Sequence, residues 1–125
     1  MDINDLTYKI RGAIFKVHQA LGPGLLESVY EAALMYELMQ TGLKVVSQMG
    51  LPVNYNGVIL ELGFRIDILV EDLVIIEIKS VEILHDVHKK QLLTYLKLSG
   101  KKIGILVNFN VSSLKDKESL IRIIN

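Results

Sequence analysis

Three charged residues interrupt two strand-like apolar segments in the middle of this 125-residue sequence. Asp67 lies within residues 64–70, and Glu77 and Lys79 lie at the end of residues 73–79. A carboxylate placed among Ile, Leu and Val side chains is costly to bury unless a partner compensates its charge. A divalent cation would compensate both carboxylates at once, so we predict a metal site here.

The same segment offers a set of oxygen ligands for that metal. Alternation along a strand puts Glu77 and Lys79 on one face and Ile78 on the other, which leaves the Ile78 carbonyl available as a further ligand. Two carboxylates, a carbonyl and water molecules suit Mg²⁺ or Mn²⁺. The sequence has no cysteine, which excludes a disulfide scaffold, a thiol nucleophile and a cysteine-type zinc site.

A shared metal also constrains how the two strands pair. Their connection is too short for a parallel crossover, so they must be antiparallel, and the numbers of paired residues then have a constant sum. A two-residue turn would give a sum of 143 and place the carboxylates on opposite faces. We therefore predict a sum of 144, which pairs Ile68 with Ile76 and requires an odd turn or a bulge, most simply a three-residue loop at 71–73.

Helices and further strands must surround this pair. Helical spacing of apolar residues predicts helices over residues 6–21, 26–37 and 84–99, and Gly22-Pro23-Gly24 ends the first of them. Additional strands are predicted over residues 44–49, 51–55, 58–62 and 102–108, with a tight hairpin turn at Asn56-Gly57. Residues 112–125 could form a short helix or an edge strand. The pattern predicts one α/β domain, residues 1–125, in which helices flank a mixed sheet.

Composition narrows the class of protein. The longest apolar runs are the length of strands, and the first five residues are polar and acidic, so we expect neither a membrane span nor a secretory signal and predict a cytoplasmic protein. The net charge is zero, but residues 1–78 carry 5 basic and 10 acidic side chains and residues 79–125 carry 9 basic and 4 acidic. One half could hold cations and the other could meet phosphates, although a solvated lysine surface explains the second half equally well.

Two motifs carry a resemblance to a known family. Asp67, followed ten residues later by Glu77-Ile78-Lys79, is similar to the core motif of the PD-(D/E)XK nuclease superfamily, with Ile66 in place of the proline. Residues 24–30 read G-x-x-E-x-x-Y and resemble the signature of the GxxExxY protein family, a branch of that superfamily. The resemblance covers residues 10–110, and its further motifs lie at 63–65, 81–82, 88, 91–93, 95–97 and 104–109. It implies a restriction-endonuclease-like core.

The resemblance also implies roles for individual residues. Asp67 and Glu77 would ligate the metal, and Lys79 would orient or activate the attacking water and offset charge on the phosphate. Glu27 would add a carboxylate from a helix to the metal or its waters. Gln91 and Tyr95 match the Q-x-x-x-Y element of RecB-like nucleases, which contacts substrate phosphate or braces the site. His88 lies one turn before Gln91 on nearly the same face.

Each of these residues also has a structural interpretation. The triad of Asp67, Glu77 and Lys79 could be an internal salt-bridge cluster in a protein that lost activity. Glu27 could simply favour the start of its helix, and Tyr30 is expected to pack rather than to catalyse. Gln91 and Tyr95 could mark the boundary of an amphipathic helix, and His88 could be a surface histidine.

Three functions follow from these alternatives. The first is a Mg²⁺- or Mn²⁺-dependent nuclease in which water attacks a phosphodiester of DNA or RNA directly. The second is a catalytically silent nuclease-fold module for nucleic-acid binding or assembly, and the third is a metal-dependent phosphoesterase with a small substrate. The complete triad favours catalysis, and the basic second half favours a polymer. A domain this small would work as a homodimer or beside a partner, because one short cleft grips little duplex.

Overall fold

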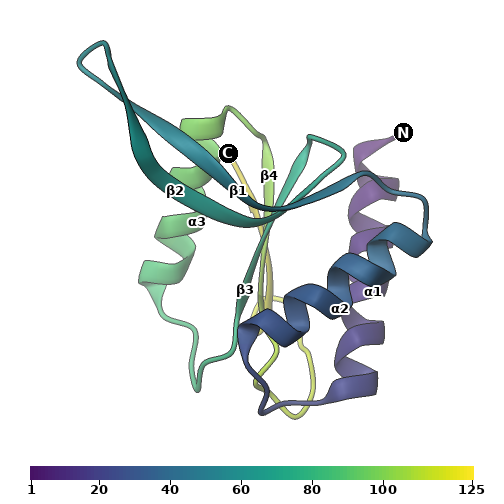
Figure 1. Ribbon diagram of the computed structural model, residues 1–125. Helices are drawn as coiled ribbons and strands as arrows, with labels where there is room; N and C mark the ends of the chain where they lie inside the picture. Colours follow the sequence, from purple (N-terminus) through teal and green to yellow (C-terminus); the bar gives the residue numbers. More distant parts are fainter.

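The computed structural model places a five-stranded sheet between helices on its two faces (Figure 1). It describes residues 1–61 and 64–125. The helices are α1 (Ile3–Leu21), α2 (Glu27–Gln40) and α3 (Asp86–Ser99), and the strands are β1 (Val45–Tyr55), β2 (Val58–Val70), β3 (Val74–Lys79), β4 (Ile103–Asn108) and β5 (Leu120–Ile124). The expectation of a mixed sheet flanked by helices is confirmed.

The strands lie in the sheet in the order in which they occur in the chain. Only β3 and β4 are parallel, and α3 forms the crossover between them. The other neighbouring pairs are antiparallel. The C-terminal segment, for which the sequence allowed a helix or a strand, is the edge strand β5.

The predicted register of β2 and β3 is confirmed. Ile68 pairs with Ile76, Leu69 with Ile75 and Val70 with Val74, so every pair sums to 144. The connection is the three-residue loop 71–73, in which Glu71 and Asp72 have positive φ angles of 52° and 56°. The Leu73 N–H donates to the Val70 carbonyl and closes the loop.

The long hairpin of β1 and β2 differs from the prediction in its continuity. Residues 44–49 and 51–55 were predicted as two strands, but all of them except Lys44 belong to β1. Residues 58–61 and 64–70 belong to β2. A proline usually ends a strand, but Pro52 lies on an edge strand, where its missing N–H is tolerated, and the register shifts there between Leu51 and Val53. The break expected at residue 63 lies outside the described residues. The turn at Asn56-Gly57 is confirmed, because Tyr55 pairs with Val58.

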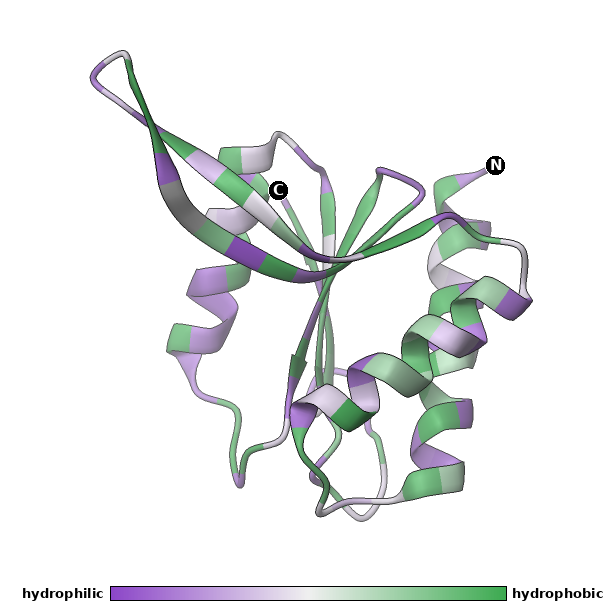
Figure 2. Ribbon diagram, in the orientation of Figure 1, coloured by the Kyte–Doolittle hydropathy of each residue, from purple (hydrophilic) through white to green (hydrophobic). Residues whose placement is uncertain are grey.

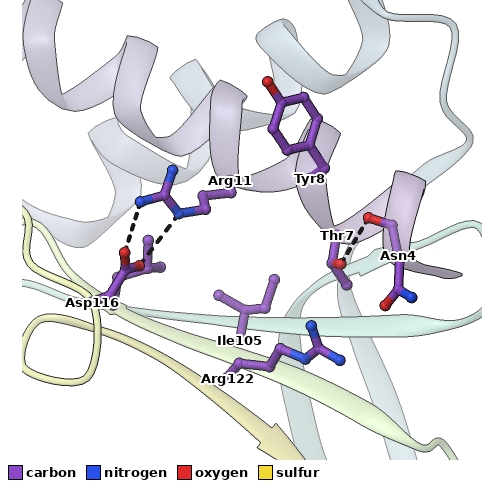
Figure 3. Close-up of a pocket in the computed structure, with 8 residues that line it drawn as sticks. Asn4, Thr7, Tyr8, Arg11, Ile105, Asp116 and Arg122 are labelled. Atoms are coloured by element: carbon purple, nitrogen blue, oxygen red, sulfur yellow. Dashed lines mark hydrogen bonds and ion pairs between the residues drawn. The ribbon is translucent and has the colours of Figure 1, made fainter.

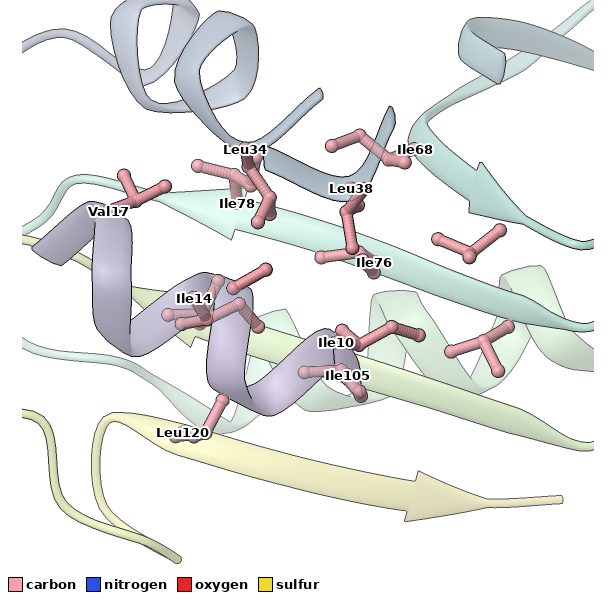
Figure 4. Packing of buried hydrophobic residues seen from close by; sticks show 14 of the residues in the cluster. Ile10, Ile14, Val17, Leu34, Leu38, Ile68, Ile76, Ile78, Ile105 and Leu120 are labelled. Atoms are coloured by element: carbon pink, nitrogen blue, oxygen red, sulfur yellow. The ribbon is translucent and has the colours of Figure 1, made fainter. Parts of the chain in front are cut away.

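Two hydrophobic clusters hold the layers together. One lies between the sheet and the pair α1 and α2, where Ile10, Leu34 and Ile76 are all fully buried (Figure 4). The other lies under α3, which packs through Leu92, Tyr95 and Leu96. The outer side of α3 carries many hydrophilic residues (Figure 2). The crossover helix is therefore held by a narrow apolar stripe.

That stripe yields a test of the packing between α3 and β4. A Cβ atom at Gly104 would lie 2.8 Å from Cδ1 and 2.9 Å from Cγ of the fully buried Leu92, so the leucine would have to shift. Gly104→Ala should therefore lower the free energy of unfolding by about 1–3 kcal/mol. Gly12→Ala is the control, because that exposed helical position has open space and alanine should stabilise it by up to about 1 kcal/mol. Urea denaturation of both variants measures the difference, and equal stability would contradict the packing described.

Candidate active site

The carboxylates of Asp67 and Glu77 lie where β2 and β3 separate. The backbone ladder of the two strands ends at the pair Ile68 and Ile76. One residue further along, the Asp67 N–H donates to Glu77 Oε2 at 2.8 Å, and the Ile78 N–H donates to Asp67 Oδ2 at 2.7 Å. Each carboxylate thus accepts a backbone N–H of the opposite strand, in place of a carbonyl.

The alternation of faces along β2 is also interrupted at this point. Residues two apart in a strand normally share a face, yet Ile66 belongs to the cluster under α3 and Ile68 to the cluster under α1 and α2. Figure 1 shows the hairpin of β1 and β2 leaving the plane of the sheet beyond this region. The separation of the strands opens the backbone edge of β3 at Ile78.

The Ile78 carbonyl faces this opening. The N–H and the carbonyl of one strand residue point to the same side, and the Ile78 N–H points to Asp67. The Lys79 carbonyl points the other way, since it accepts from the Phe109 N–H at 3.0 Å. The carbonyl predicted as a third oxygen ligand therefore points to the side on which Asp67 lies.

Burial and mutual repulsion leave the two carboxyl groups hard to ionise. Glu77 is only 4% exposed. Burial, and then the neighbouring Asp67, raises the pKa of Glu77 to about 8, although Lys79 opposes the shift. Burial likewise raises the pKa of Asp67, against the hydrogen bonds from Ile78 and Gln48. A cation between these groups would reverse both shifts.

Helix α2 brings Glu27 to the end of β3. Glu27 Oε2 accepts a hydrogen bond from the Ser80 N–H at 3.2 Å, and the Ser80 hydroxyl donates to the Leu25 carbonyl at 2.6 Å. Ser80 directly follows Lys79, so the start of α2 is tied to the backbone next to the ammonium-bearing residue. The negative charge of Glu27 acts on Asp67 and contributes to the rise in its pKa.

Tyr30 fixes the connection that positions Glu27. Its fully buried ring stacks on Phe109 with the ring centroids 4.4 Å apart. Its hydroxyl donates to the Gly22 carbonyl at 2.6 Å and accepts from the Leu25 N–H at 3.2 Å. The packing role expected for this tyrosine is confirmed, and Gly22-Pro23-Gly24 is the connection between α1 and α2.

Two further residues, Glu31 and Gln48, join the carboxylates, and sequence reasoning missed both. The Gln48 side-chain amide donates to Glu31 Oε1 at 2.7 Å and to Asp67 Oδ1 at 3.3 Å. Burial, Asp67 and Glu27 raise the pKa of Glu31, while the hydrogen bond from Gln48 lowers it. Glu31 follows Glu27 by one helical turn, and that spacing could have revealed it. Nothing in the sequence around Gln48 marks it.

Helix α3 approaches the site from the face of the sheet opposite to α1 and α2. Burial raises the pKa of the Tyr95 hydroxyl, and the negative charges of Glu77 and Asp67 add to the rise. The Tyr95 ring packs against Phe64, with the ring centroids 4.9 Å apart. The predicted substrate residue Tyr95 therefore lies within electrostatic range of the carboxylates.

The two other residues predicted on α3 lie toward its N-terminal end. Burial and then Lys79 lower the pKa of His88, while Glu27 raises it, so the imidazole is within range of both charges. His88 Nδ1 accepts from the His85 N–H at 3.0 Å, which helps to cap the helix. Gln91 is half-buried between His88 and Tyr95 on the same helix.

The donor set fits a hard divalent cation, but it is a sparse one. Across residues 1–61 and 64–125, no three Asp, Glu or His side chains are gathered closely enough to hold a metal by themselves. The groups that could serve as ligands are two carboxylates and one carbonyl, and water would complete the shell of Mg²⁺ or Mn²⁺. Burial is the main cause of the raised pKa values of Asp67 and Glu77, and such an ion would stabilise the ionised form of both groups.

A pocket of about 440 Å³ lies elsewhere, between α1 and the strands β4 and β5 (Figure 3). At its rim, Arg11 and Asp116 form an ion pair, with Nη2 and Oδ2 2.8 Å apart. This pair ties the segment before β5 to α1. The lining residues do not include Glu27, Glu31, Asp67 or Glu77, so we do not assign the pocket to the same site.

The raised pKa of Glu77 predicts how stability depends on pH. The folded protein keeps the Glu77 proton up to about pH 8, whereas the unfolded chain loses it near the ordinary value of 4.5. Stability of the metal-free protein should therefore fall as pH rises from 4.5 to 8, in total by a few kcal/mol, since each pKa unit corresponds to about 1.4 kcal/mol. Glu77→Gln should flatten this profile and be more stable than the wild type at pH 8.

Thermal unfolding with a chelator present measures this dependence. The exposed Glu118→Gln variant is the matched control and should follow the wild-type profile. A Glu77→Gln variant that keeps the wild-type dependence on pH would show that another group titrates.

Comparison with known proteins identifies the family. The family model of the PD-(D/E)XK nuclease superfamily matches residues 4–123. No curated protein and no solved structure matches the chain significantly. In the described part of the chain, no helix has the length and apolar character needed to cross a membrane. Because the family model matches nearly the whole sequence, and the mixed sheet carries the carboxylates at its centre, the chain belongs to the PD-(D/E)XK nuclease superfamily.

Proposed function

We propose that this protein is a divalent-metal-dependent nuclease that hydrolyses phosphodiester bonds of nucleic acid. The observation that carries the proposal is the junction of β2 and β3. There Glu77 accepts from the Asp67 N–H and Asp67 accepts from the Ile78 N–H, and Lys79 follows Glu77 by two residues. Membership of the nuclease superfamily supports the same chemistry. The match to the G-x-x-E-x-x-Y signature at Gly24, Glu27 and Tyr30 further suggests the GxxExxY branch.

The chain's own residues would divide the chemistry among them. Asp67, Glu77 and the Ile78 carbonyl would hold Mg²⁺ or Mn²⁺, and Glu27 would accept hydrogen bonds from water in the outer shell. The bound ion would supply Lewis acidity at a phosphoryl oxygen and make a water molecule more acidic. Lys79 would orient the attacking water and stabilise the charge that develops on the phosphate.

Helix α3 would meet the substrate. His88, Gln91 and Tyr95 lie along the helix that covers the face from which the carboxylates are reached. Residues 79–125 carry the excess of positive charge, which favours a polymer of phosphates over a small substrate. A single domain, a cytoplasmic location and a homodimeric state stay predictions.

Metal binding is the first test of this function. Mn²⁺ or Mg²⁺ should raise the melting temperature of the wild type by mass action, because the folded site binds the ion and the unfolded chain does not. Asp67→Asn should abolish the rise, since it removes a negative ligand while keeping its shape. Isothermal titration calorimetry measures the affinity directly, and unchanged affinity in both Asp67→Asn and Glu77→Gln would remove these residues from the site.

Catalysis by Lys79 is the second test. Lys79→Ala should leave folding and Mn²⁺ affinity close to the wild type and lower the cleavage rate by about 10²–10³, the usual effect of losing one transition-state contact. Lys9→Ala, at an exposed position on α1, is the matched control. Cleavage and binding are measured on a panel of single- and double-stranded DNA and RNA, together with small phosphodiesters.

The outcomes of this second test separate the alternatives. Equal rates for the wild type and Lys79→Ala would point to a contaminating nuclease. A wild type that binds metal and nucleic acid but cleaves no member of the panel would favour the catalytically silent module. Cleavage restricted to small phosphodiesters would favour the phosphoesterase.

A further inference from the structure

Gln48 has a strained backbone in the middle of a regular strand. Its φ angle is 52°, a value that glycine adopts freely and that other residues adopt at a cost. The residues on either side keep the same register with β2, since Ser47 pairs with Ile68 and Met49 with Ile66. Gln48 is therefore not an inserted bulge residue, and the strain belongs to this position alone.

Packing does not explain the strain, because Gln48 is exposed. A residue in this region costs about 1–3 kcal/mol and persists where its surroundings hold it on several sides. Here the holding contacts are polar. The Gln48 carbonyl accepts from Arg65 Nη1 at 3.1 Å, and the side-chain amide donates to Glu31 Oε1 at 2.7 Å and to Asp67 Oδ1 at 3.3 Å.

The amide thus bridges two carboxylates from different elements. Glu31 belongs to α2 and Asp67 to β2, and the charge of each adds to the rise that burial causes in the pKa of Glu77. A neutral group that donates two N–H bonds lets the carboxylates approach each other without adding a charge that would compete with a metal. With the Ile78 N–H on Oδ2 and Gln48 on Oδ1, both oxygens of Asp67 are held.

We propose that Gln48 is a positioning residue of the metal site, which holds the Asp67 carboxylate in its ligating orientation and ties Glu31 of α2 to it. The inference rests on the proposed function, because it gives the bridge a role in holding a metal. Outer partners of metal ligands typically change metal affinity or activity by about 10–100-fold when they are removed.

Two substitutions separate this role from a structural one. Gln48→Gly removes the amide and relieves the strain at positive φ, whereas Gln48→Met removes the amide but keeps a side chain of similar length and the strain. The glycine variant should therefore melt at a higher temperature than the methionine variant. Both should lose about 10–100-fold in Mn²⁺ affinity, because both lack the donor that orients Asp67.

Asn56→Gly is the matched control. Asn56 is also exposed, has a φ angle of 50° and lies in the hairpin turn, where none of its contacts reaches the carboxylates. Its glycine variant should gain stability and keep the wild-type Mn²⁺ affinity. The control thus measures what relief of strain does without loss of the bridge.

Calorimetry with Mn²⁺ and thermal unfolding of all three variants complete the experiment. Wild-type Mn²⁺ affinity in both Gln48 variants would overturn the positioning role and leave the proposed function intact. An affinity loss that follows the melting temperature, large in Gln48→Met and absent in Gln48→Gly, would also overturn it. A wild type that binds no Mn²⁺ would instead overturn the proposed function, and the positioning role with it.

Discussion

The structure depends on an exchange of hydrogen bonds between side chains and backbone at the point where β2 and β3 part. The Asp67 and Glu77 carboxylates each accept an N–H from the opposite strand, so the strands separate without leaving those two donors unpaired. This arrangement places the buried carboxyl group of Glu77 and the half-buried one of Asp67 beside an open stretch of backbone. The helices and the long hairpin are arranged around that opening.

This arrangement makes the carboxyl groups harder to ionise. The pKa of Glu77 rises to about 8, because the group is buried and faces another carboxylate, and Lys79 compensates only in part. Such a site is unfavourable for folding alone and is suited to a cation, a relation typical of functional sites. The proposed binding of a metal would account for both the pair of carboxyl groups and the open Ile78 carbonyl.

Contacts between residues far apart in the chain hold α2 against this site. Tyr30 stacks on Phe109 and closes the connection after α1, and Glu27 reaches the Ser80 N–H. Gln48 links the same helix to Asp67 from the β1 side. The G-x-x-E-x-x-Y segment therefore combines a packing residue with a charged one: the tyrosine orients the helix, and the glutamate meets the end of β3.

Local pattern in the sequence determined the strand pair, its register and the position of its carboxylates, because alternation and turn length are properties of neighbouring residues. It also determined Tyr30 as a packing residue and Asn56-Gly57 as a turn. Only the tertiary structure showed β1 as one continuous strand and brought Glu31 and Gln48 to Asp67. Those contacts join residues 17 and 19 positions apart through a strained backbone angle, which no local period encodes.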